Sequence, residues 1–306
     1  MRKAALDAIS ELLVSNDKIV FIGSDLGAGT LADAKSRHPK RVLMEGIAEQ
    51  HLIGFAAGLA LEGFIPYVHT IGTFLTRRAI EQVIIDVALH NLPVRLVASG
   101  GGMVYAPLGP THQAIDDFAL MRAIPNMMVV APADPHEMRD VICELADYGG
   151  PAYIRVGKGG EPDATSLLTP NSIGKIRQIN YGHQVAILTT GSLLQECTAA
   201  TTQLETRGLS VGLYHVPYIA PLDTPVINQL IDRYEFLVVV EEHLPHGGLS
   251  TAIAEIMAPV NSKARLRSLT LPNKYASKYG SQREHQVASK LTSDGIVESV
   301  QNYFSN

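Results

Sequence analysis

Short apolar runs alternate with stretches of helical spacing along the chain, and this alternation predicts an α/β fold. Apolar runs at residues 19–23, 41–44, 65–70, 94–98, 127–131 and 153–156 predict strands. Helical spacing covers residues 4–14, the stretch that follows Met44, and residues 76–89, 115–123 and 135–148. Strands separated by helices are typical of a mainly parallel sheet that is covered on both faces.

The pattern changes at residues 157–180, where Gly157, Gly159, Gly160, Pro162 and Pro170 punctuate a polar segment. Such a segment is typical of a linker between domains. Beyond it, apolar runs at residues 185–192, 210–214 and 236–240 predict a second set of strands, with helices between and after them. We predict two doubly wound α/β domains, residues 1–160 and a smaller one at 181–306, joined by a linker at 161–180.

The composition and net charge of the chain exclude some classes of function. The 306 residues are 46% hydrophobic and 18% charged, which allows sizeable cores. The formal net charge of −5 argues against nucleic-acid binding, which needs a basic excess. Cys143 and Cys197 have no metal-ligand spacing and are interpreted as buried free thiols in a reducing compartment. With no apolar signal region and no run of 18 apolar residues, the sequence predicts a soluble, cytoplasmic protein.

The most informative stretch places Glu49 at the start of an apolar helix. Residues 52–61 carry no charge, and Gly54 and Gly58 are among several small residues that let another backbone come close. We therefore expect the carboxylate to be shielded from water, where it could hold a proton for exchange. The alternative is a first-turn glutamate that is favoured only by the helix dipole.

The run Gly46-Ile47-Ala48-Glu49-Gln50-His51 resembles the activating-glutamate motif of thiamine-diphosphate enzymes of the transketolase family. Further family motifs follow in the family's order: Gly23-Ser24-Asp25-Leu26, Gly72-Thr73-Phe74, Gly109-Pro110-Thr111-His112-Gln113, Ala133-Asp134 and Val239-Val240-Glu241-Glu242-His243. The resemblance implies a thiamine-diphosphate pyrimidine-binding domain followed by the transketolase C-terminal domain. It also implies that Glu49 binds N1′ of the aminopyrimidine, so that the cofactor can form its nucleophilic ylid.

Other roles are carried over residue by residue. The resemblance implies cofactor contacts from Phe74, Asp25 and Leu26, and a catalytic His112 that donates to a substrate hydroxyl or developing alkoxide. The competing interpretations are a core phenylalanine, a turn cap at Asp25 and a loop-capping histidine.

Three arginines are the candidate substrate-binding residues. The resemblance implies that Arg155 and Arg2 bind a substrate phosphate, and Arg77 could stack or contact one. Surface salt bridges or a solvated cation are the alternatives. Glu241-Glu242-His243 is interpreted as structural or interfacial, without a catalytic role.

The family's diphosphate and metal motif, Gly-Asp-Gly followed by an Asn pair, does not occur. The related Ser293-Asp294-Gly295 fits a turn. Because the chain starts where the pyrimidine-binding domain should start, we expect a split enzyme. A separate N-terminal subunit would hold the diphosphate and its Mg²⁺ (or Ca²⁺), and two copies of each chain would form an α2β2 heterotetramer.

Two departures from the transketolase pattern bear on the substrate, because Leu108 and Gly100 stand where the family has an Asp and a His. Both losses remove polar recognition of a sugar. The prediction is a transferase of carbohydrate metabolism that moves a two-carbon ketol unit from a ketose (phosphate) to an aldose, with an unusual sugar. The alternatives are a β-subunit of a 2-oxo acid dehydrogenase, a deoxyxylulose-phosphate-synthase-like enzyme, or a non-catalytic scaffold.

Overall fold

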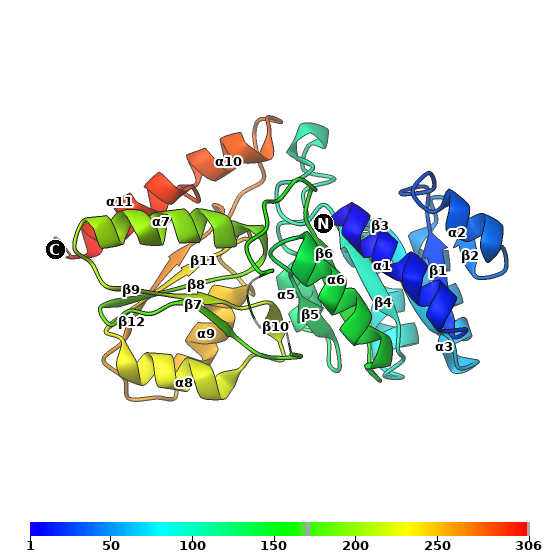
Figure 1. Cartoon of the computed structure of the whole chain (residues 1–306), viewed down its shortest axis with the longest axis horizontal. Coiled ribbons are helices and arrows are strands. Elements are labelled where there is room, and N and C mark those ends of the chain that lie inside the picture. Colours follow the sequence, from blue (N-terminus) through cyan, green and yellow to red (C-terminus); the bar gives the residue numbers. More distant parts are fainter. Residues whose placement is uncertain (167, 169–171, 305–306) are drawn as a thin grey trace. The chain divides into compact units, whose positions relative to one another are not determined.

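The computed structural model of the chain describes residues 1–166, 168 and 172–304 (Figure 1). The chain forms two compact units. The first unit comprises Met1–Gly101 and Leu120–Ile173, and the second comprises Gly102–Ala119 and Gly174–Asn306. Part of the predicted linker at 161–180, namely residues 167 and 169–171 with Pro170, lies outside the described residues.

The first unit is built on a parallel sheet whose strands follow the order β5-β6-β4-β3-β1-β2. Every residue of β1, β4 and β6 is buried, as expected for parallel strands covered on both faces. Helices α1 and α6 lie side by side on one face (Figure 1). The strands are β1 (Ile19–Gly23), β2 (Val42–Met44), β3 (Ile65–Ile71), β4 (Arg95–Ser99), β5 (Met128–Val130) and β6 (Ala152–Val156). The helices are α1 (Arg2–Ser15), α2 (Ala32–Arg37), α3 (Glu49–Leu61), α4 (Ile80–Gln82), α6 (Pro135–Glu144) and the 3₁₀ turn η4 (Leu145–Asp147).

The strand register brings the carboxyl ends of the central strands to one edge. Gly23 pairs with His69, and Ser99 pairs with both Ile71 and Val156. The loops that follow these strands therefore begin next to one another. This edge is where open α/β sheets bind their ligands.

The second unit has a sheet of order β12-β11-β8-β9-β7, parallel except for the antiparallel edge strand β7. Helices α7 and α11 cover one face, and α8 and α9 cover the other (Figure 1). Its strands are β7 (Arg177–Asn180), β8 (Val185–Thr189), β9 (Val211–His215), β11 (Phe236–Val240) and β12 (Arg265–Leu269), while the short strand β10 (Tyr218–Ala220) is not part of this sheet. The helices are η3 (Ala106–Leu108), α5 (Asp117–Arg122), η5 (Gly191–Leu193), α7 (Leu194–Thr206), α8 (Thr224–Arg233), α9 (Leu249–Met257), α10 (Gln282–Ala288) and α11 (Ser293–Phe304).

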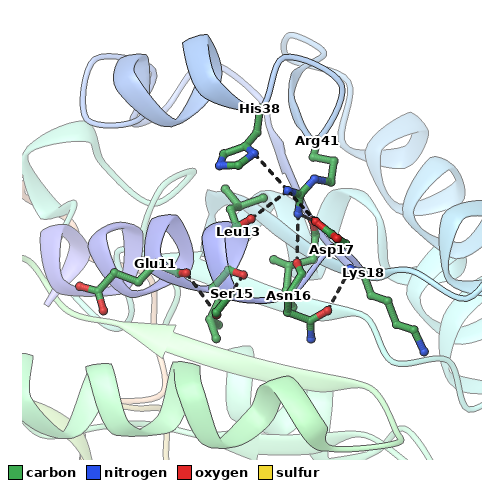
Figure 2. Close-up of polar contacts among 10 residues, drawn as sticks. Glu11, Leu13, Ser15, Asn16, Asp17, Lys18, His38 and Arg41 are labelled. Atoms are coloured by element: carbon green, nitrogen blue, oxygen red, sulfur yellow. Dashed lines mark hydrogen bonds and ion pairs between the residues drawn. The ribbon is translucent and has the colours of Figure 1, made fainter.

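Arg41 caps the carboxyl end of α1 (Figure 2). Its guanidinium donates to the carbonyls of Leu13 at 2.9 Å and Asn16 at 3.0 Å, and one nitrogen lies 3.3 Å from Asp17 Oδ1. These carbonyls have no partner within the helix, so a cation with several N–H groups is a fitting cap. The contact ties α1 to the loop before β2.

The prediction of two α/β domains with mainly parallel sheets is confirmed, and the differences are local. The helix predicted at 76–89 is interrupted: π-helical turns at Phe74–Arg78 (η1) and Val83–Ala88 (η2) flank α4. Ser293-Asp294-Gly295 begins α11 instead of forming a turn. A Cβ on Gly295 would lie 2.7 Å from the Lys290 backbone, so glycine allows α11 to start there.

Two further predictions meet the structure in part. Cys197 is buried, and burial raises the pKa of its thiol to about 12, whereas Cys143 is only half-buried. Among the helices in the described part of the chain, none has the length and apolar character that crossing a membrane requires.

Candidate functional site

Glu49 is the first residue of α3 and lies at the carboxyl edge of the first unit's sheet. Only 1% of its surface is exposed, which agrees with the shielding expected from the small residues of α3. Its Oε2 accepts a hydrogen bond from Arg78 Nη1 at 2.6 Å, and its Oε1 accepts a longer one from Thr70 Oγ1 at 3.4 Å. A buried carboxylate is thus satisfied by one partly exposed cation and one strand hydroxyl.

Phe74 lies next to this carboxylate and holds the same cation. The Arg78 guanidinium carbon is 3.9 Å from the centroid of the Phe74 ring. Glu49 and Phe74 therefore grip a flat, N–H-donating group, one by hydrogen bonding and the other by its ring face. An aminopyrimidine that carries a proton on N1′ is also flat and also donates an N–H. The residues present thus fit the pyrimidine end of thiamine diphosphate.

A chain of hydroxyls joins Asp25 to the same carboxylate. Ser24 Oγ lies 2.9 Å from Asp25 Oδ1 and 2.9 Å from Thr70 Oγ1, and Thr70 in turn reaches Glu49. Asp25 itself is exposed, so its carboxylate faces solvent while its neighbour Ser24 is buried. The sequence had singled out Asp25 but neither Ser24 nor Thr70.

Leu26 is held through its backbone by a buried histidine that the sequence analysis did not select. His69 Nδ1 is 3.3 Å from the Leu26 carbonyl oxygen, and Nε2 is 2.9 Å from Ser99 Oγ. Burial, with a smaller contribution from the charge of Arg2, lowers the pKa of His69 to about 4, although the hydrogen bond to the Leu26 carbonyl acts to raise it. The imidazole is therefore neutral at physiological pH, with Nδ1–H donating to Leu26 and Nε2 accepting from Ser99. It fixes the loop after β1.

The three predicted substrate arginines belong to the first unit, in different surroundings. Arg155, at the end of β6, is 9% exposed, and a Cβ on Gly101 would overlap its side chain. Arg2 is exposed at the start of α1, and Arg77 is half-buried in η1. The cation that contacts Glu49 and Phe74 is Arg78, the neighbour of the predicted Arg77. The sequence analysis did not select Arg78, because its contact with Glu49 leaves no signal in the sequence.

His112 belongs to the second unit, within the segment Gly102–Ala119. It is half-buried, its backbone N–H donates to the Gly109 carbonyl at 3.0 Å, and its Nδ1 lies 2.8 Å from Thr111 Oγ1. Leu108, which replaces the family's acidic residue, is 52% exposed.

Nothing in the described part of the chain gathers three His, Cys, Asp or Glu side chains as a metal site requires.

The chain matches two consecutive domains of one family. Residues 1–160 match the transketolase pyrimidine-binding domain, and residues 174–296 match the transketolase C-terminal domain. The chain therefore belongs to the transketolase family. The pyrimidine-binding domain implies thiamine diphosphate as its cofactor.

Curated relatives include two 1-deoxy-D-xylulose-5-phosphate synthases. That of Dictyoglomus thermophilum is 35% identical over 96% of this chain and 48% of its own length. That of Aromatoleum aromaticum is 33% identical over 98% of this chain and 47% of its own length. The chain thus spans about half the length of the curated relatives it matches.

Two solved structures are informative. A split-gene transketolase, described as an inactive β4 tetramer, is 30% identical with a TM-score of 0.88, over 98% of this chain and 96% of that one. Transketolase from Campylobacter jejuni has a TM-score of 0.80 at 15% identity, over 97% of this chain and 46% of that one, and shows the shared fold alone.

Proposed function

We propose that this chain is the pyrimidine-binding subunit of a split, thiamine-diphosphate-dependent, transketolase-like enzyme. The enzyme would transfer a two-carbon ketol unit from a ketose (phosphate) donor to an aldose acceptor. One observation carries the proposal. Glu49 is 1% exposed and accepts a hydrogen bond from the guanidinium of Arg78, a flat N–H-donating group that also lies over the Phe74 ring. That pair of contacts is what an aminopyrimidine needs.

The proposed roles follow from burial and position. Bound thiamine diphosphate supplies the carbon nucleophile that attacks the donor ketose. Glu49 holds or releases the proton at N1′, and its burial keeps water from competing for that proton. Phe74 holds the ring in plane, while Leu26 and Asp25 line the approach from the loop after β1. The neutral His69 keeps that loop in place.

Substrate contacts are proposed for the remaining sites. His112 would donate a hydrogen bond to a substrate hydroxyl or to the developing alkoxide. Arg155, Arg2 and Arg77 would bind a substrate phosphate, for which the guanidinium fork is suited. Leu108 offers no hydrogen bond to a sugar, so the acceptor or donor is expected to differ from ordinary pentose phosphates.

We infer that a separate subunit binds the diphosphate and its Mg²⁺ or Ca²⁺. The inference is supported by coverage, because the chain spans 48% of a curated relative but 96% of a split-gene transketolase subunit. The first unit also exposes apolar side chains on and around α3 that a second copy of this chain could cover: Ile47, Leu61, Ile85 and Leu89. Sedimentation of the assembled complex should give an α2β2 heterotetramer, and a monomer of this chain within that complex would contradict the arrangement.

Proton exchange at the cofactor's C2 tests the central proposal. In the complex with the diphosphate-binding subunit, Glu49→Gln should slow C2 exchange by about 10²- to 10⁴-fold, because glutamine cannot carry the proton. Glu45→Gln is the matched control, since Glu45 is an exposed residue four positions earlier whose carboxylate lies 3.5 Å from His51 Nε2. Unchanged exchange in Glu49→Gln would refute the assignment of Glu49.

The second candidate function is condensation of a 2-oxo acid with an aldose phosphate, favoured by the relatives' name, 1-deoxy-D-xylulose-5-phosphate synthase. The two functions differ in the donor. Incubation with pyruvate releases CO₂ only in the second, whereas a ketose donor yields a shortened aldose only in the first. Mass spectrometry of both reactions distinguishes them.

A further inference from the structure

The segment Gly102–Ala119, which carries His112, is gripped at both ends by consecutive residues of the second unit. At its carboxyl end, His243 Nε2 accepts from Ala119 N at 3.4 Å, and the His243 ring stacks on Phe118 at 5.2 Å. At its amino end, Glu242 Oε1 accepts from the backbone N–H of Met103 at 2.6 Å. Glu242 and His243 directly follow β11 and belong to the motif that our sequence analysis interpreted as structural or interfacial.

Glu242 is a buried carboxylate with several donors. It is 5% exposed. Besides Met103 N, Oε1 accepts from Gln282 Nε2 at 3.0 Å, while Oε2 accepts from Gln282 Nε2 at 3.1 Å and from Gln286 Nε2 at 2.6 Å. The two glutamines lie four residues apart on α10. One side chain thus joins the end of β11, α10 and the start of the segment Gly102–Ala119.

Gly102 makes this approach possible. Its φ of +64° lies in the region that favours glycine, and a Cβ there would lie 2.4 Å from Glu242 Oε1. The Gly102 N–H donates to the Ala114 carbonyl at 2.8 Å, which closes the loop that contains His112. Glu242 therefore lies directly against Gly102 and Met103, where that loop begins.

We propose that Glu242 is a positioning residue that fixes the amino end of the segment Gly102–Ala119 and so aims His112 at the substrate. This inference rests on the proposed role of His112 in ketol transfer. Releasing the Met103 contact frees one end of the loop while His243 still holds the other. The loop then samples other positions, and the fraction of time that His112 spends in a reactive geometry falls.

The neighbouring Glu241 provides a matched control. It is 0% exposed, and its carboxylate accepts from Leu249 N at 2.8 Å, Ser250 N at 2.8 Å and Ser250 Oγ at 2.7 Å. These bonds cap the start of α9 and do not involve the segment Gly102–Ala119. Replacing Glu241 tests the effect of losing a buried carboxylate from the same unit, without release of the loop.

The experiment measures three quantities in the complex with the diphosphate-binding subunit: the kcat and KM of ketol transfer, the rate of C2 proton exchange, and amide hydrogen exchange of residues 103–112. In Glu242→Ala we expect kcat to fall by about 10- to 100-fold, C2 exchange to stay within about twofold, and these amides to exchange faster. Adding His112→Ala to Glu242→Ala should lower kcat little further, because Glu242 is proposed to act through His112.

Two variants guard against a general loss of structure. In Glu242→Gln most of the activity should remain, because the new amide can accept from Met103 N and donate to a reversed Gln286 amide. Glu241→Ala should lower thermal stability. Any change in the kcat of ketol transfer should be matched by an equal change in the rate of C2 proton exchange, in contrast to Glu242→Ala.

Glu242→Ala that keeps both kcat and amide protection would overturn the proposal, as would equal losses of transfer and C2 exchange. Faster amide exchange with an unchanged kcat would confirm that Glu242 holds the loop, but it would overturn the proposal that this contact aims His112. If the complex performs no ketol transfer even in the wild type, the proposed function fails, and amide exchange still reports whether Glu242 holds the loop.

Discussion

Acidification from about pH 7 to about pH 5 should destabilise the chain through His69. The imidazole is 1% exposed, and burial lowers its pKa to about 4 from 6.5. Between these two pKa values the unfolded chain binds a proton that the folded chain does not, so the free energy of unfolding falls as the pH falls. A pKa difference of about 2.5, at about 1.36 kcal/mol for each pKa unit, limits the loss to about 3 kcal/mol. About 2 kcal/mol of that is lost by pH 5.

His69→Gln isolates this contribution. The glutamine carboxamide can accept from Ser99 and donate to the Leu26 carbonyl, but it does not titrate. The other histidines and the carboxylates titrate in both proteins and cancel in the difference between their free energies of unfolding. Denaturant unfolding followed by circular dichroism should show the wild type losing about 2 kcal/mol relative to the variant between pH 7 and pH 5. A difference that stays constant with pH would refute the reasoning, and so would an NMR titration of the His69 ring near pH 6.5.

Two further predictions concern arginines. Arg41→Ala should lower the free energy of unfolding by about 1–3 kcal/mol, because the Leu13 carbonyl loses its side-chain donor and the Asn16 carbonyl keeps only the Ile19 N–H; denaturant unfolding measures it, and an unchanged midpoint would contradict the cap. Arg78→Met should destabilise the free chain but leave the complex's affinity for thiamine diphosphate equal or higher, because the cofactor no longer competes with the guanidinium for Glu49. Calorimetric titration tests this, and markedly weaker binding would mean that Arg78 itself assists the cofactor.

The sequence predicted much of the sheet because buried parallel strands leave a direct signal. All positions of β1, β4 and β6 are buried, so mostly apolar runs stand between turn-forming residues. The small uncharged residues in α3 predicted that Glu49 is shielded, and Glu49 is 1% exposed, but its role toward the cofactor came from the motif Gly46–His51 and stays a prediction. Polar edge elements were missed. β12 alternates arginine with other residues and is largely exposed, so its apolar signal is weak.

The contacts between distant residues could not be predicted. Within residues 1–160, the segment Gly102–Ala119 packs with the second unit, and no pattern in the sequence indicated this. That packing depends on contacts with Glu242 and His243, more than a hundred residues away. It also requires a glycine at position 102, because a Cβ there would overlap the Glu242 carboxylate. A linear pattern records which residues are small or charged, but not which of them meet. For the same reason the pairing of Arg78 with Glu49 was not predicted, whereas the proposed phosphate contact of Arg77 stays a prediction.

The unequal exposure of Glu49 and Arg78 indicates which partner can move. The Glu49 side chain is 1% exposed and the Arg78 side chain is 40% exposed. Arg78 can return to water at little cost, whereas a buried Glu49 left without a donor would be strongly unfavourable. A flat ligand that brings its own N–H donor can therefore replace Arg78 on both Glu49 and Phe74 without leaving the carboxylate unsatisfied. A buried structural glutamate would also need a donor, so the contact alone does not establish a pyrimidine site; what it adds to the proposal is that the more exposed partner, Arg78, is the one that a ligand would replace.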